Sequence, residues 1–316
     1  MSFISQIKVA AVAVACASLL AGCFTGVEST PRITDRDIKR RDVRTSAEMT
    51  FMADVVPEAP SHWQAGKKLM VTDNRIALIF TPGVDGASTY IPDSLGGSVL
   101  NLTDVSFIKG LTGDDEVQFA FADTNGNRLV YRPVMQRRAF DADSTLQIPF
   151  TIDLDLVAKA NQRLAGNTYY ILTPRRFRDN GFEIQGLRYV PVKIAEVVPG
   201  NSNYPLRVRF TEAGVADTLS LFMTVGSSRV ATRNFETLFA FNDPRTLYPT
   251  IEDDAWELIK KSRVRVGMTP DECRLALGAP AEYIRVPSTA GMVERWSYGD
   301  GIYMFFEDGH LTRFRR

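Results

Sequence analysis

The sequence has few of the residues and motifs on which most enzymes depend. Two of its 316 residues are histidine, His62 and His310, and three are cysteine. It contains no His-Glu-x-x-His metal motif, no Gly-x-Ser-x-Gly nucleophile elbow, no phosphate-binding loop and no glycine pattern of a dinucleotide-binding fold. Its formal net charge is zero, which argues against a nucleic-acid-binding protein. We therefore predict a chain that is not an enzyme, needs no cofactor or metal and binds no nucleic acid.

The apolar run near the N-terminus is short. Lys8 precedes an apolar stretch over residues 9–20, a length typical of a secretory signal and too short to span a membrane comfortably. The tetrapeptide that follows on from this stretch is Leu20, Ala21, Gly22 and Cys23. It resembles the bacterial lipobox, which implies cleavage before Cys23 and acylation of that residue. Several acyl chains on one residue anchor a protein stably, whereas a single chain is marginal.

The lipobox divides the N-terminal part of the chain. Residues 1–22 are expected to be a lipoprotein signal peptide, and residues 23–47 a lipidated flexible tether that is polar and slightly basic. Phe24 and Thr25 follow the lipid site, and neither is the aspartate of inner-membrane retention. The resemblance thus implies an outer-membrane protein. A periplasm-facing position is favoured, and the leaflet is left open.

This processing leaves Cys273 as the one cysteine of the mature chain, because Cys16 is removed with the signal and Cys23 carries lipid. An intrachain disulfide and a cysteine metal cluster are then excluded. Cys273 lies beside Ala276 and Leu277 on a predicted helix, so we expect a buried small hydrophobic residue and not a reactive thiol.

Two β modules are predicted between the tether and the C-terminal part, over residues 48–136 and 137–233. Apolar and polar residues alternate in short runs, among them residues 75–80 and 117–121, and glycine-rich turns separate the runs. The second module is expected to open with a linker helix that begins near Asp153 and ends before Gly166.

The two modules are similar in sequence. Residues 65–71 resemble residues 165–171, and Gly97 parallels Gly186. We interpret this as a tandem duplication of one β unit. In strand length and copy size the units resemble the SH3-like barrels of bacterial envelope proteins.

The region 234–316 predicts a connecting helix over 234–241 and then a small α+β domain. A helix is expected over about 251–262, and a second one follows Thr269, which together with Glu272 forms a capping box. Gly278 and Pro280 end this second helix. Four strands follow, at about 282–287, 292–298, 302–307 and 310–315, with Asp308-Gly309 as a hairpin turn.

This order of elements resembles the BamE (SmpA/OmlA) family of small outer-membrane lipoprotein domains, over about 65 residues. The matching positions are Gly267, Met268, Thr269, Leu277, Gly278, Pro280, Trp296, Tyr298, Phe305, Phe306, Asp308 and Gly309. A free-standing member of that family would lack the roughly 200 residues that precede the domain here. The resemblance implies a fold of two helices and an antiparallel sheet, and these residues are expected to act as caps, turns and core.

The sequence as a whole predicts a multidomain protein with two small all-β modules followed by an α+β domain. We expect a non-enzymatic lipoprotein that is anchored to the outer membrane and acts as a protein-interaction scaffold in outer-membrane assembly or maintenance. The alternative is a lipoprotein whose β repeats bind peptidoglycan or another glycan. A cleft lined by aromatic and carboxylate side chains would favour the glycan-binding function. An exposed apolar patch with a polar rim would favour binding of a protein partner.

Overall fold

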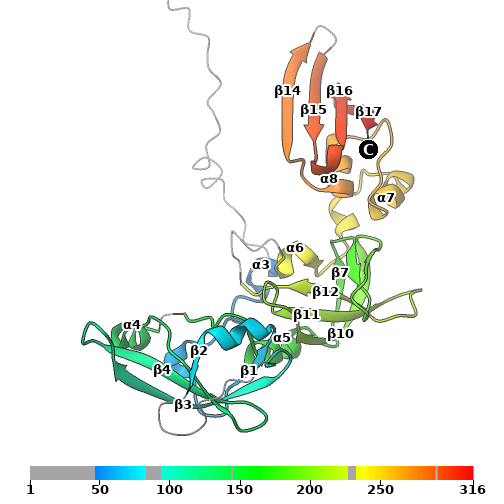
Figure 1. Ribbon diagram of the computed structural model, residues 1–316. Coiled ribbons are helices and arrows are strands. Elements are labelled where there is room, and N and C mark those ends of the chain that lie inside the picture. The colour runs from blue at the N-terminus through cyan, green and yellow to red at the C-terminus, as the bar shows by residue number, and fades with distance from the viewer. Residues whose placement is uncertain (1–46, 83–93, 144, 227–232, 289–290, 316) are drawn as a thin grey trace, which may run out of the picture. The chain divides into compact units, whose positions relative to one another are not determined.

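The protein is described here from a computed structural model, which covers residues 47–82, 94–143, 145–226, 233–288 and 291–315 (Figure 1). Over these residues the protein is rich in β structure, with seventeen strands in three antiparallel sheets. The signal segment, the lipobox Leu20 to Cys23 and nearly all of the tether lie outside the described residues.

The first sheet has the strand order β2-β5-β4-β3-β1-β6. Its strands are β1 (Lys68–Val71), β2 (Phe80–Pro82), β3 (Val99–Lys109), β4 (Asp115–Ala122), β5 (Arg128–Tyr131) and β6 (Thr151–Asp153). Strand β4 shows which face of the sheet forms the core, since Val117, Phe119 and Phe121 alternate along it and all are fully buried. The helix α4 (Arg137–Asp141) places Phe140 against this core.

The second sheet has the order β13-β7-β10-β11-β12-β8-β9. Its strands are β7 (Thr168–Ile171), β8 (Arg175–Phe177), β9 (Glu183–Gln185), β10 (Val190–Pro199), β11 (Leu206–Glu212), β12 (Leu219–Met223) and β13 (Phe239–Ala240). The predicted linker helix is confirmed as α5 (Leu154–Leu164), which packs on β10 (Figure 1). The short helices α3 (Ala47–Phe51) and α6 (Phe235–Leu238) contact each other and the same core.

The two sheets share one strand order, because β6-β1-β3-β4-β5-β2 corresponds to β13-β7-β10-β11-β12-β8. Their backbone hydrogen bonds correspond as well. The Gly66 N–H donates to Leu102 O at 2.8 Å, and the Gly166 N–H donates to Ile194 O at 2.9 Å. A register shift follows Leu102 in β3 and Ile194 in β10. The shared topology supports the predicted tandem repeat, while the narrower SH3-like assignment remains a prediction.

One pairing within the repeat differs from the prediction. The N–H of Gly97 donates to Val71 O, and in the second sheet the N–H of Tyr189, not of Gly186, donates to Ile171 O. Both residues have positive φ, +83° for Gly97 and +57° for Tyr189. Tyr189 thus occupies the position of Gly97 and accepts a backbone conformation that glycine takes more easily.

Two further segments differ from the sequence-based expectation. Residues 75–80 were expected as a strand, but Asn74–Leu78 forms a 3-10 helix (η2), because the Asp73 side chain accepts from the Arg75 N–H and starts a turn. The connecting helix expected over 234–241 is the four-residue α6, after which the chain joins the second sheet as β13. Its apolar residues belong to the core of the second sheet.

The C-terminal unit has the predicted order of two helices and a four-stranded sheet. The helices are α7 (Asp253–Lys260) and α8 (Pro270–Leu277), and the strands are β14 (Glu282–Ser288), β15 (Gly291–Ser297), β16 (Tyr303–Glu307) and β17 (His310–Arg315). The sheet order is β14-β15-β16-β17. Both helices lie near one end of this sheet, so that the β14–β15 hairpin extends past them (Figure 1).

Candidate functional site

The residues of the BamE-like motif meet around α8. Thr269 and Glu272 form the predicted capping box, with the Thr269 N–H donating to Glu272 Oε2 at 2.7 Å. Met268 is buried, and its carbonyl accepts from the N–H of Leu311 in β17 at 2.7 Å. Gly267 closes the same contact by donating to the Leu311 carbonyl at 2.8 Å. These residues hold the start of α8 to the edge strand of the sheet.

The motif residues after α8 complete this core. Trp296 is fully buried, and its indole N–H donates to Glu294 Oε2 at 3.1 Å. The Tyr298 hydroxyl donates to the carbonyl of Gly278 at 3.1 Å, and burial raises the pKa of Tyr298 to about 12. Pro280 is partly buried beyond the helix end. The motif thus acts as caps, turns and core, as the sequence predicted.

Cys273 is fully buried within this core. Burial raises the pKa of its thiol to about 12, and the nearby Glu272 carboxylate acts in the same direction. A thiol with that pKa holds almost no thiolate at neutral pH, so Cys273 packs as a small hydrophobic residue.

The C-terminal sheet leaves apolar side chains exposed on the face away from its buried core. The register places Ile284, Arg295 and Phe305 side by side, on the face opposite to Trp296. Ile284 is 47% exposed and Val286, two residues further along β14, is 48% exposed. The Arg313 guanidinium lies 4.2 Å from the centre of the Phe305 ring. This uncovered face therefore combines apolar side chains with an arginine rim.

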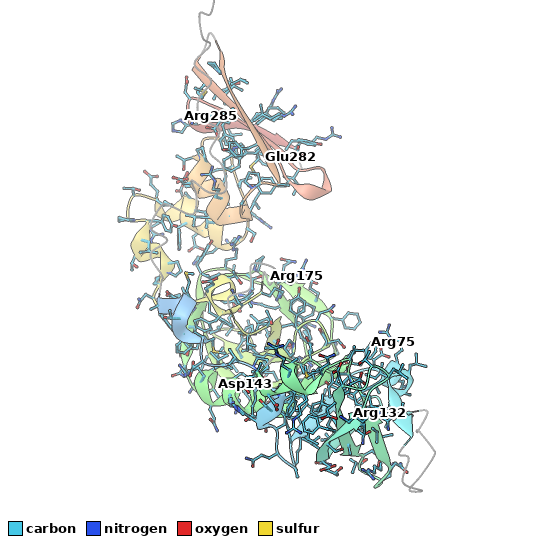
Figure 2. The ribbon with its side chains drawn as sticks, turned by 90° about the vertical axis from the view of Figure 1, so that its left-hand side faces the viewer. Arg75, Arg132, Asp143, Arg175, Glu282 and Arg285 are labelled. Carbon is cyan, nitrogen blue, oxygen red and sulfur yellow. The ribbon has the colours of Figure 1, made fainter. Side chains whose placement is uncertain are left out.

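Strand β14 is the edge of this sheet and has β15 as its one neighbour among the described residues. Residues 281–287 are all exposed, among them Glu282 and Arg285 (Figure 2). The Nε of Arg285 lies 3.0 Å from Oε1 of Glu294 in β15. An exposed edge strand of this kind can pair with an extended segment of another chain. We define Ile284, Val286 and the free edge of β14 as the hairpin surface.

A cavity of about 680 Å³ is lined by residues of β1, β6 and α5, by the segments that precede β1 and β6, and by residues 202–205 and 224–225 beside the strands of the second sheet. Among its walls are Trp63, Asp153, Leu156, Asn203 and Tyr204. The Thr72 and Ser202 hydroxyls, one from each module, are 2.6 Å apart near this cavity. Its size lies in the range of small-molecule sites.

Lys67 is buried and contacts Asp153, which lines this cavity. The Nζ of Lys67 lies 3.0 Å from Asp153, 2.9 Å from Asp155 and 3.4 Å from Glu58, and its side chain is 3% exposed. Burial by itself lowers the pKa of Lys67, but the hydrogen bonds and charges of Asp155 and Asp153 outweigh it and leave the pKa raised. The ammonium also lies 5.4 Å from the Trp63 ring centre. The Asp153 carboxylate of the cavity wall is therefore already paired with the Lys67 ammonium.

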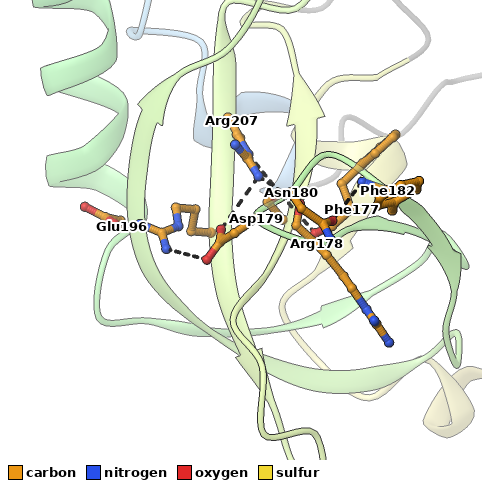
Figure 3. A network of polar contacts seen from close by, with 9 residues as sticks. Phe177, Arg178, Asp179, Asn180, Phe182, Glu196 and Arg207 are labelled. Carbon is orange, nitrogen blue, oxygen red and sulfur yellow. Dashed lines mark hydrogen bonds and ion pairs between the residues drawn. The ribbon is translucent and has the colours of Figure 1, made fainter.

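The basic and aromatic segment Arg175–Arg178 is not a free loop. Arg175 pairs with Glu183 at 2.8 Å, and Arg176 is fully buried. Beside them Asp179 accepts from Arg209 at 3.1 Å and faces Arg207 (Figure 3). Positive charges here are matched by carboxylates, so the segment gives no support for an anionic glycan contact.

His62 and Asp123 also have local partners. His62 lies 3.6 Å from Asp143 on the surface. Asp123 accepts from the N–H groups of Asn125 and Asn127, both at 2.8 Å, and so closes a tight turn. Among the described residues no group of three or more histidine, cysteine, aspartate or glutamate side chains could hold a metal ion. No helix within the described ranges is long and apolar enough to cross a membrane.

Sequence reasoning missed the Lys67 cluster and the burial of Arg176. The partners of Lys67 include Asp153 and Asp155, more than eighty residues away. Asp153 caps the start of α5 and Asp155 lies in its first turn, so the pair could be identified as a helix-capping signal, but nothing in the sequence links it to Lys67.

Comparison with known proteins finds no matching protein family, no matching curated protein and no matching solved structure.

Proposed function

We propose that this protein is a non-enzymatic lipoprotein, anchored to the outer membrane through Cys23, that acts as a scaffold in the cell envelope. Its partner is a protein whose extended segment pairs with β14. The observation that supports this proposal is the hairpin surface, where an unpaired strand edge adjoins exposed Ile284 and Val286. The lipobox supports the anchor, and the BamE-like order of elements supports a role in outer-membrane assembly or maintenance.

The physical basis of partner binding is strand addition. Backbone groups of an added strand would pair with the free edge of β14, and alternate side chains would cover Ile284 and Val286. Burial of apolar surface contributes roughly 25 cal/mol per Å². Covering Ile284 and Val286 would therefore add to the binding free energy that the backbone hydrogen bonds supply, and no reactive group is needed.

Site-specific photocrosslinking in intact cells tests this proposal. A photoreactive residue at position 284 is expected to give a discrete envelope-protein adduct, and the adduct should be lost when Val286 is changed to Asp. The matched control position is Leu111, an apolar residue that is fully exposed in the first module. Equal adducts at positions 284 and 111, or none at either, would contradict the proposal.

The anchor is tested by cell fractionation. Wild-type protein should remain with the membrane after a salt wash, and the Cys23→Ala protein should be released. Retention of an intact, unlipidated Cys23→Ala protein would show that another contact holds it.

A second candidate function is glycan binding in the cavity of the β modules. The favouring observation is a cavity of about 680 Å³ that contains Trp63 and Tyr204 together with neutral polar side chains such as Asn203. Saturable binding of soluble peptidoglycan fragments, weakened by Tyr204→Ala and unaffected by Ile284→Asp, would support it. Absence of binding at millimolar fragment would exclude it.

A further inference from the structure

A second cavity, of about 410 Å³, is lined by two arginines that have no carboxylate partner among the described residues. Arg188 precedes β10, and Arg233 precedes α6. The other walls come from the residues after β7, from α6, from the turn after α7 and from the end of α8, namely Leu172, Thr173, Pro174, Thr237, Leu238, Ser262, Ala276, Leu277 and Gly278. The lining contains no acidic side chain.

The contacts of the two arginines leave donors unused. Arg188 donates from Nε to Leu172 O and from Nη1 to Ala276 O, both at 2.8 Å. Arg233 donates from Nε to Phe222 O at 2.8 Å, while its Nη2 is buried without a hydrogen-bond partner in the described structure. Backbone carbonyls satisfy part of each guanidinium but do not neutralise its charge.

Ser262, in the same lining, also has a side-chain atom without a hydrogen-bond partner among the described residues. The Oγ of Ser262 is also buried without a partner in the described part of the chain. Ser262 has a φ of +54°, a conformation that non-glycine residues rarely adopt. A buried donor without a partner costs about 1–3 kcal/mol, and two of them belong to residues that line one cavity.

No nearby carboxylate neutralises the positive charge of Arg188 and Arg233 among the described residues. Glu183 is the acidic residue whose charge acts on Arg233, but it is already paired with Arg175 at 2.8 Å. Burial lowers the pKa of both Arg188 and Arg233. An oxyanion would supply acceptors for these donors, and arginine binds carboxylate and phosphate groups with matched geometry.

From these observations we propose that this cavity binds the oxyanion of a small organic molecule, a carboxylate or a phosphate ester. The volume exceeds that of a lone ion and lies in the range of small-molecule pockets, so the anion is one end of a larger ligand. Arg233 and Ser262 bind the anionic group, and Arg188, fixed by Leu172 and Ala276, adds positive charge. This site is separate from the hairpin surface.

Isothermal titration calorimetry of the purified protein with inorganic phosphate and with succinate tests the site and distinguishes the two anions. One of them should bind saturably at a single site, and Arg233→Met should weaken that binding at least about tenfold, the loss expected for a charge-assisted hydrogen bond. Arg209→Met is the matched control, because Arg209 also has a buried Nε without a partner but pairs with Glu196 and Asp179 away from the cavity. It should leave the affinity unchanged.

Thermal melting of each variant shows whether it folds. If Arg233→Met does not, Ser262→Ala replaces it, with an expected weakening of about three- to tenfold. Lack of saturable binding of either anion in the millimolar range would overturn the proposal. An equal loss in Arg209→Met and in the cavity variant would overturn it as well.

Discussion

The first and second sheets of this protein share their strand order, but at one interior position the first sheet has an apolar side chain and the second has a charged one. In the first sheet Thr81 of β2 is opposite Val130, and in the second sheet Phe177 of β8 is opposite Ser220. The residues before them, Phe80 and Arg176, therefore correspond. One is an aromatic core residue, and the other is a fully buried arginine.

The two side chains are stabilised by different interactions. The Phe80 ring packs on Phe121, with ring centres 6.1 Å apart. The Arg176 guanidinium donates to Glu212 at 3.0 Å, to the carbonyl of Thr173 at 2.9 Å and to the carbonyl of Leu187. Burial lowers the pKa of Arg176, and the charge of Glu212 opposes that effect. The two sheets therefore have the same strand pairing although one buries an aromatic side chain at this position and the other buries an ion pair.

The second sheet contains a glycine that accommodates the arginine. A Cβ on Gly186 would lie 2.5 Å from Cζ of Arg176, and the Gly186 N–H donates to the carbonyl of Pro174 at 2.8 Å. Gly186 is therefore needed because a guanidinium packs against its backbone, a requirement that the first sheet does not have.

The largest expected effect comes from placing an arginine in the first sheet. Phe80→Arg would bury a cation without a free carboxylate, because Asp123, at the position of Glu212, is engaged by its own turn. We expect the free energy of unfolding of this sheet to fall by more than about 3 kcal/mol. Hydrogen exchange of β3–β5 in urea measures it. If Phe80→Leu costs as much, the charge is not the cause.

The next effect is the loss of the arginine's partner. Glu212→Ala leaves Arg176 buried without a carboxylate, and we expect a loss of about 3–5 kcal/mol in the second sheet. The control Glu196→Ala breaks a more exposed pair with Arg209 and should cost about 1 kcal/mol or less. Equal losses in hydrogen exchange of β10–β12 would show that the buried pair has no special role.

A smaller loss is expected when a methyl group is added at Gly186. Gly186→Ala should cost about 1–3 kcal/mol through overpacking against Arg176. In an Arg176→Met background the added cost should shrink, because the flexible side chain can move away. Chemical denaturation of the four variants of this cycle measures the coupling, and additive costs would indicate that the two residues do not interact.

The smallest effect is expected when both charges are replaced. The double variant Arg176→Met, Glu212→Leu gives the second sheet an apolar interior like that of the first, and buried ion pairs are often replaced this way without loss of stability. We expect thermal melting at or above the wild-type temperature. A clear decrease would mean that the ion pair stabilises this sheet beyond what packing supplies.

Local signals in the sequence predicted much of the fold. Thr269 and Glu272 defined the start of α8, and alternation and turn residues defined β14 to β17. The repeat was detectable because residues 65–71 resemble residues 165–171, and these segments contain the equivalent strands β1 and β7, which have the same burial pattern.

Contacts between distant segments could not be predicted in this way. Arg176 belongs to a segment that looks like an exposed basic loop, and its partner Glu212 is 36 residues away. The walls of the anion cavity come from segments as distant as Leu172 and Gly278. Such sites depend on which strands become neighbours, and alternation in one strand carries no information about that.

The proposed scaffold role is tested most directly by crosslinking in intact cells, followed by purification through the lipid-anchored protein and mass spectrometry. We expect the same outer-membrane protein to be recovered reproducibly with wild type and with the surface control Leu111→Asp. It should be lost with Ile284→Asp, Val286→Asp, which removes the apolar side chains of the hairpin surface while the protein stays folded. Recovery of the same partners from all three proteins would contradict the account.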